Sequence, residues 1–306
     1  MTDTARIVTL FPAATEMVCA IGLAHALVGV SHECDHPAWV AQYPRVTRSR
    51  LPAGATSAEI DRFVRECAHA GEPLYDLDEK LIADLRPSLI VAQALCGVCA
   101  VSEGAVSSLA KRLSPPPHVL FLQPSRLDDV LAGMQALGEA AGATFGAQAA
   151  VDALRARISA IRARTDDLSA RPRVAFLEWL DPPFCAGHWT PELVRLAGGV
   201  NVLGEEGCPS RRVGWDEIAS AKPDVLAIAC CGYSPDQARA DWGRISSRPD
   251  MQSIPAVRDG HVLFFDGSQF FNRPGPRLVD SLEHLARALH PGLFADLSLH
   301  RDTAIR

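Results

Sequence analysis

Two cysteines separated by two residues, Cys96 and Cys99, are the residues of this chain with the clearest capacity for chemistry. Their spacing lets two thiolates hold one soft metal ion. It also suits a redox pair, because a cysteine near a helix N-terminus has a lowered pKa. A third interpretation is packing, since free cysteine is among the most buried residue types. Cys34 follows another apolar run, so we predict that Cys34, Cys96 and Cys99 are candidate ligands of a thiolate-bound zinc or iron ion.

The run from His32 to His36 holds five potential ligands in five consecutive positions. In an extended loop, alternation sends His32, Cys34 and His36 to one side and the two acidic residues to the other. Turn chemistry is the alternative, because Asp35 can bond to a turn and Pro37 can start the next segment. From this run we predict His32, Cys34 and Asp35 as ligand-binding residues.

Aromatic and thiol side chains of the second half could line a site for a large planar ligand. Flat rings provide contact area at little entropic cost. The candidates that follow strands or precede helices are Trp179, His188, Trp189, Cys230, Tyr233 and Phe271. Arg273 could meet a carboxylate, amide or phosphate of a chelate, although a solvated loop arginine is the alternative. Core packing is the other interpretation of the rings, and we expect it for Trp215 and Trp242.

Two stretches, residues 84–97 and 220–232, must position these side chains, and they repeat one pattern. Each has a helix end, a basic residue before proline, an apolar run, and then cysteine and glycine. An apolar run after such a proline is typical of a buried parallel strand. Its carboxyl end is where open α/β sheets hold ligands. The repeat therefore predicts two similar α/β lobes with a ligand cleft between them.

The segment between these lobes, residues 144–169, contains no proline. Its apolar residues are spaced by three and four and form one stripe: Val151, Leu154, Ile158 and Ile161. We predict one long backbone helix here, with an ordinary surface helix as the alternative. The predicted fold class is α/β, with two Rossmann-like lobes, residues 1–143 and 170–306, joined by this helix.

Composition narrows the class of protein. Hydrophobic residues make up 48% and charged residues 22%, as in a globular protein. A net charge of -6 argues against a nucleic-acid partner, and no apolar run reaches the roughly 20 residues of a membrane span. The start shows no signal peptide, which predicts a cytoplasmic protein, or a periplasmic one if the chain is processed or truncated. Common nucleotide-binding and hydrolase motifs are absent, so we do not expect an enzyme.

Six segments carry a resemblance to a known family. In the first lobe they are RIVTLFPAATEMVCAIG, LVGVSHECDHP and LRPSLIVAQ, and in the second ELVRLAGGVNVLGE, IASAKPDVLAIACCGY and VRDGHVLFFDG. They resemble the class III substrate-binding proteins of ABC importers, which have the helical-backbone metal-receptor fold and carry cobalamin, haem and iron chelates. SHECDHP and LCGVCAVS look closest to the cobalamin-binding subgroup. The resemblance covers nearly the whole chain.

The resemblance implies a protein that binds a metal chelate, first of all a corrinoid, for an ABC-type uptake system or as a soluble relative of one. Phe11 and Pro12, in the first segment, become candidate ligand contacts. Many exported members carry an acidic residue just before the LAGG segment, where it docks on the permease. Arg195 stands there in this chain, so Glu192, one turn earlier, and Glu79, on the other lobe, are the candidate docking residues.

Two other functions stay open at this point. One is a cytosolic thiol-rich protein for metal handling or redox sensing, which would use Cys34, Cys96 and Cys99. The other is a small-molecule enzyme built on the same two lobes.

Overall fold

The computed structural model describes residues 5–52, 54–94 and 101–297, which form two compact units. The first unit comprises Met1–Ala55, Arg62–Pro124 and Asp128–Ala153. The second comprises Thr56–Asp61, Ser125–Leu127 and Leu154–Arg306. Each unit combines a sheet of mainly parallel strands with helices, so the predicted fold class of two α/β lobes is confirmed.

The sheet of the first unit has four parallel strands in the order β2-β1-β5-β6. Their bounds are β1 Ile7–Thr9, β2 Leu27–Gly29, β5 Leu89–Gln93 and β6 His118–Leu122. The central strands β1 and β5 are buried throughout, as expected for a parallel sheet covered on both faces. A separate antiparallel pair, β3 Thr47–Ser49 and β4 Tyr75–Leu77, is not predicted by the sequence.

The first unit also contains helices. Those in the first unit, wholly or for the most part, are α1 Pro12–Ala20, α2 Ser57–Ala70, α3 Glu79–Leu85, α4 Glu103–Arg112 and α5 Leu127–Ala140, with 3-10 turns at Ala24–Ala26 and Ala38–Gln42. Ser102 caps α4 by accepting a hydrogen bond from the Ala105 N–H. Apolar side chains of β1, β5, α3 and α4 meet in one core, for example Val8, Ile82 and Ile90.

The second unit has a mixed sheet in the order β10-β8-β7-β11-β12, with β9 paired to β7. The strands are β7 Arg173–Leu180, β8 Pro183–Cys185, β9 Val200–Asn201, β10 Arg211–Arg212, β11 Val225–Ile228 and β12 Val262–Phe264. Strands β8 and β10 are antiparallel additions at one edge. The helices are α7 Thr190–Leu196, α8 Trp215–Ser220, α9 Pro235–Ile245, α10 Pro255–Arg258 and α11 Leu278–Leu289, with a 3-10 turn at Pro249–Ser253.

The repeated proline pattern has the same backbone form in both units. Arg86 and Lys222, the residues before the two prolines, have left-handed φ angles of 43° and 46°. A left-handed residue ends a helix, and a following proline cannot continue it. The strands that follow, β5 and β11, each lie inside their sheet, β5 between β1 and β6 and β11 between β7 and β12.

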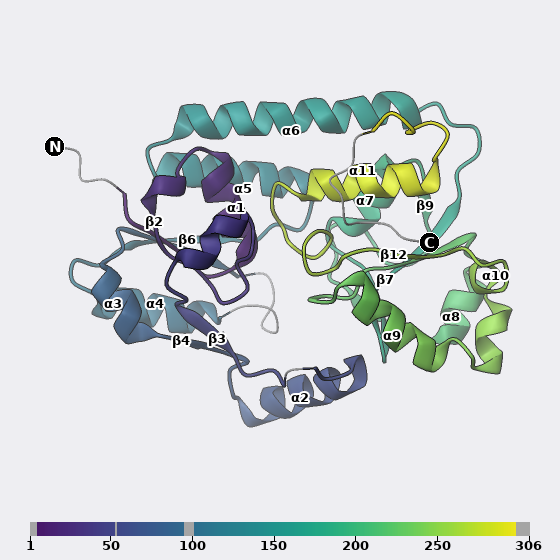
Figure 1. Cartoon of the computed structure of the whole chain (residues 1–306), viewed down its shortest axis with the longest axis horizontal. Coiled ribbons are helices and arrows are strands. Elements are labelled where there is room, and N and C mark those ends of the chain that lie inside the picture. The colour runs from purple at the N-terminus through teal and green to yellow at the C-terminus, as the bar shows by residue number, and fades with distance from the viewer. Residues whose placement is uncertain (1–4, 53, 95–100, 298–306) are drawn as a thin grey trace. The chain divides into compact units, whose positions relative to one another are not determined.

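Helix α6, Thr144–Thr165, is one unbroken helix of 22 residues (Figure 1) and crosses from the first unit to the second at Ala153. It ends four residues before the predicted limit. There Arg171 donates to the C=O groups of Thr165 and Asp166, at 2.7 and 2.9 Å. In the part of the chain that the structure describes, no helix combines the length and the apolarity of a membrane span.

Candidate functional site

The carboxyl end of β1 leads directly into helix α1. Phe11 is the extended residue that precedes the helix, and Pro12 is its first residue, a position that suits the fixed φ of proline. Both side chains are buried. Their place after a central parallel strand agrees with the expected ligand edge of the sheet, while their burial leaves little side-chain surface for contact.

Cys34, in the loop after β2, lies at the end of a buried hydrogen-bonded chain. The hydroxyl oxygens of Thr9 and Thr15 are 2.6 Å apart, and the Cys34 Sγ lies 3.0 Å from Thr15 Oγ1 and 3.1 Å from Ser31 Oγ. Cys34 is only 1% exposed, and burial raises the pKa of its thiol. These contacts fit a neutral thiol that ties the loop to β1 and α1.

His32 points to a different neighbour. Its backbone N–H donates to Thr47 Oγ1 at 2.9 Å, and its ring Nδ1 is hydrogen-bonded to the same oxygen at 2.7 Å. Burial and the nearby Arg45 lower the pKa of the ring. The segment is not extended, because the Cys34 N–H donates to the Ser31 C=O across a turn. The predicted alternation is therefore absent, and Asp35 is exposed.

The predicted thiolate metal site gains no support from the structure. Cys96 and Cys99 lie outside the described residues. Among those that are described, no three His, Cys, Asp or Glu side chains are grouped so that they could hold a metal ion. Cys34, the third predicted ligand, is occupied by hydroxyl partners.

Two aromatic residues of the second unit meet at the ends of β7 and β11. The rings of Trp179 and Tyr233 are 5.4 Å apart, and Trp179 Nε1 donates to the Ser57 C=O at 3.2 Å. Trp179 is half-buried, whereas Tyr233 is buried. Burial and the nearby Asp241 raise the pKa of Tyr233. Cys230, three residues before this tyrosine, lies in the hydrophobic core of the unit.

A second aromatic group forms around Phe271. Its ring lies 5.1 Å from that of Phe176 and 4.9 Å from that of Phe265. Trp189 Nε1 donates to the Phe271 C=O at 2.8 Å, so two predicted site residues are joined. Both are buried, and their contacts are those of a packed core.

His188 and Arg273 complete the predicted ligand residues. His188 is half-buried, has a left-handed φ of 52° and places its ring 5.5 Å from that of Trp189. Burial lowers the pKa of the His188 ring. Arg273 is buried, unlike the solvated loop arginine that was the alternative. The side chains of Trp179 and His188 thus remain partly exposed in this unit.

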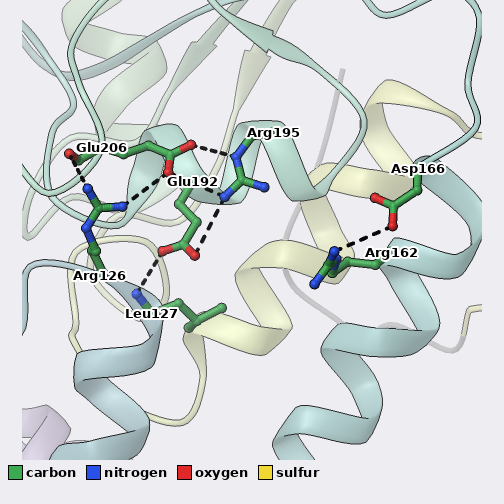
Figure 2. Close-up of polar contacts among 7 residues, drawn as sticks. All are labelled: Arg126, Leu127, Arg162, Asp166, Glu192, Arg195 and Glu206. Carbon is green, nitrogen blue, oxygen red and sulfur yellow. Dashed lines mark hydrogen bonds and ion pairs between the residues drawn. The ribbon is translucent and has the colours of Figure 1, made fainter.

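The two predicted docking carboxylates have different environments. Glu79, the first residue of α3, is exposed and pairs with Arg112 at 2.6 Å. The side chain of Glu192, in α7, is 15% exposed and lies 3.8 Å from Arg195. Figure 2 shows its carboxylate turned to the backbone N–H of Leu127, which donates to it at 2.9 Å.

A charged cluster beside α7 is a feature that the sequence interpretation misses. Glu206 pairs with Arg195 at 2.7 Å and with Arg126 at 3.4 Å (Figure 2), and these arginines lower the pKa of Glu206. A hollow of about 420 Å³ opens beside it, lined by Arg171, Pro191, Arg195, Gly199, Val200, Asn201, Gly204 and Glu206. Local sequence does not bring Arg126 into this cluster, since it lies 80 residues before Glu206.

Each unit is an α/β fold with ligand candidates after parallel strands. Residues 7–268 match the family model described as periplasmic binding protein, and the chain belongs to this family. It is 26% identical to a vitamin B12-binding protein of Vibrio cholerae over 93% of this chain and 88% of the relative. It is 22% identical to an uncharacterised ABC transporter substrate-binding lipoprotein of Bacillus subtilis, over 95% and 82%. These relatives are named as binding proteins rather than as enzymes.

Solved structures show the same fold. A periplasmic haem-binding protein from Pseudomonas aeruginosa superposes with a TM-score of 0.71 at 21% identity, covering 94% of this chain and 93% of the other. The periplasmic vitamin B12-binding protein of Vibrio cholerae superposes with a TM-score of 0.67 at 23% identity, covering 94% and 96%. The resemblance to this class, noted from the sequence, is confirmed.

The predicted cytoplasmic location is wrong. The similar proteins are described as periplasmic or as a lipoprotein, which conflicts with a cytoplasmic binding protein. The prediction rested on the residues at the start of the sequence alone.

Proposed function

We propose that this protein binds a corrinoid of the cobalamin type as the substrate-binding component of an ABC-type uptake system. The observation that carries the proposal is the match to vitamin B12-binding proteins along nearly the whole of both chains. A match of this extent includes both units, so it does not arise from a single α/β motif that many unrelated proteins share.

Several candidate residues fit such a ligand better than others. A bulky chelate needs side chains that reach solvent in the free protein, and His32, Asp35, Trp179 and His188 are exposed or half-buried. The remaining candidates are buried in the free protein: Phe11, Pro12, Cys34, Trp189, Cys230, Tyr233, Phe271 and Arg273. Aromatic rings with fixed neighbours suit a flat macrocycle, because little conformational entropy is lost on binding.

The test is a parallel calorimetric titration with cyanocobalamin, cobinamide, haemin and zinc. Saturable binding of a corrinoid, tighter than that of haemin, supports the proposal. Selective binding of haemin would contradict the corrinoid proposal and indicate a haem as the ligand, as named for several similar structures. Binding of zinc alone supports the thiol-rich alternative instead.

An importer is the partner that this function requires. Glu79 is the better of the two docking candidates, because its carboxylate is exposed and its surface ion pair with Arg112 is weak. Glu192 would first have to release the Leu127 N–H. In transport assays with the cognate permease, Glu79→Ala should therefore reduce uptake while leaving chelate affinity unchanged. Unchanged uptake would show that Glu79 does not take part in docking.

A further inference from the structure

The segment between Val30 and Arg45 forms a closed loop in the first unit. The Val30 N–H donates to the Pro44 C=O at 3.0 Å, and the Val46 N–H donates to the Val30 C=O at 2.9 Å. A compact loop whose ends meet in this way is an Ω-loop, a form that often carries function. Inside it, the Arg45 guanidinium donates to the Ser31 C=O at 3.0 Å and the Cys34 C=O at 2.6 Å.

Two predicted ligands of the loop, Cys34 and His32, bond to neighbouring side chains, while Asp35 and Trp39 are exposed. Cys34 is buried, His32 is bonded to Thr47, and Val40 is fully buried and anchors the far part of the loop. Trp39, the residue before this anchor, is 41% exposed. Its ring lies 6.1 Å from that of Tyr43 at an interplanar angle of 60°. An indole held by an edge contact on a fixed loop can meet a ligand with little loss of freedom.

We propose that Trp39, positioned by Tyr43, is a contact for the planar face of the metal chelate. The inference rests on the proposed chelate-binding function and adds a residue to it. The loop begins where β2 ends, which is the edge of a parallel sheet where ligands bind. A corrin or porphyrin offers a broad flat face, and an exposed indole offers a matching surface that is apolar yet tolerates water in the free protein.

The experiment compares four proteins by calorimetric titration with cyanocobalamin and with haemin. They are the full-length wild type, Trp39→Ala, Trp39→Phe and Phe145→Ala. Phe145 is the matched control, because this α6 aromatic is 88% exposed and is not a proposed contact. We expect Trp39→Ala to weaken the chelate affinity about tenfold, Trp39→Phe to retain most of it, and Phe145→Ala to change nothing. Thermal melts should coincide, since an exposed side chain contributes little to stability.

Three outcomes overturn the proposal, and they can be told apart. If the wild type binds a chelate and Trp39→Ala binds it equally well, Trp39 is not a contact, while the proposed function stands. If the wild type binds neither chelate, the function and the contact fall together. If Trp39→Ala changes only the sedimentation behaviour of the protein, the indole is covered by a second copy of the chain.

Discussion

The Asp241 carboxylate accepts a hydrogen bond at 2.9 Å from the backbone N–H of Ser57, a residue 184 positions earlier in the chain. Asp241 lies in α9 and is 6% exposed, whereas Ser57 begins α2. The unit boundary falls inside α2, so Ser57 belongs to the second unit while the helix from Arg62 onward belongs to the first. Because the first N–H groups of a helix lack partners within it, a buried carboxylate there is a strong acceptor.

Glu192 repeats this arrangement with Leu127, the first residue of α5. Leu127 also belongs to the second unit, while α5 from Asp128 onward belongs to the first. Two carboxylates of the second unit thus each accept a hydrogen bond from the first N–H group of a helix whose later residues belong to the first unit.

Replacing Asp241 with alanine should lower the free energy of unfolding by about 1–2 kcal/mol, because the Ser57 N–H loses its acceptor and Arg244 loses its ion pair. Urea unfolding measures this change, and hydrogen exchange should accelerate at Ser57. Asp236→Ala is the matched control on the same helix, since the Asp236 side chain is 94% exposed. Equal effects of the two substitutions would contradict a role for the Ser57 contact.

Glu192→Ala should destabilise the protein by about 1 kcal/mol, and Glu79→Ala by less than about 0.5 kcal/mol. The difference follows from environment, because Glu192 binds a helix N-terminus while Glu79 makes an exposed ion pair. Guanidinium unfolding of both variants provides the comparison. A larger loss for Glu79→Ala would mean that the Leu127 contact contributes little.

Most helices and central strands of both units can be predicted from local sequence. Caps, prolines and apolar periodicity act over a few residues, so the helix predicted over residues 144–169 is found as α6, Thr144–Thr165. The directions of side chains depend on segments distant in the sequence, so local sequence patterns do not predict them. Arg157 lies outside the apolar stripe of the predicted backbone helix, yet its guanidinium bonds to Asp280 and Glu283 of α11. In Figure 1, the part of α6 that belongs to the second unit, from Leu154 onward, runs alongside α11.

The candidate site is harder to predict for the same reason. A cysteine or aromatic residue at a strand end can face a ligand or the core. The sequence pattern is the same in the two cases, so it does not distinguish them. Cys230 and Phe271 face the core, whereas Trp39, which is not a predicted site residue, is exposed. Residue type predicts which chemistry is available, and packing decides which side chains can use it.

The thiols should differ widely in reactivity, because the thiolate is the reactive form. Among the cysteines that the structure describes, Cys208 and Cys231 are exposed and should be alkylated first by iodoacetamide at pH 8. Cys34 and Cys230 should react slowly, since both are buried and burial raises the pKa of each thiol. Peptide mass spectrometry after timed labelling measures the rates, with urea-unfolded protein as the control in which all react. Rapid labelling of Cys34 in the folded protein would restore it as a candidate thiolate ligand.

Stability should fall as the pH is lowered from 7.5 to 5.5, and His32 should account for part of the loss. Burial and the positive charge of Arg45 lower the pKa of His32 below its ordinary value of 6.5. The unfolded chain therefore takes up a proton at this residue more readily than the folded one, so protonation favours unfolding below about pH 6.5. The contribution of His32 to the free energy of unfolding is fully present above that pH. It decreases as the pH falls toward the lowered pKa of His32 in the folded protein.

Urea unfolding of the wild type and of His32→Gln at pH 7.5 and 5.5 isolates the contribution of His32 to the pH dependence of stability, because the other titrating groups contribute equally to both proteins. We expect a smaller loss of stability for His32→Gln over this interval. His188 should contribute with the same sign, since burial lowers its pKa as well, so the variant should keep part of the pH dependence. Identical pH dependence in the two proteins would show that the His32 ring is protonated as easily in the folded state as in the unfolded chain.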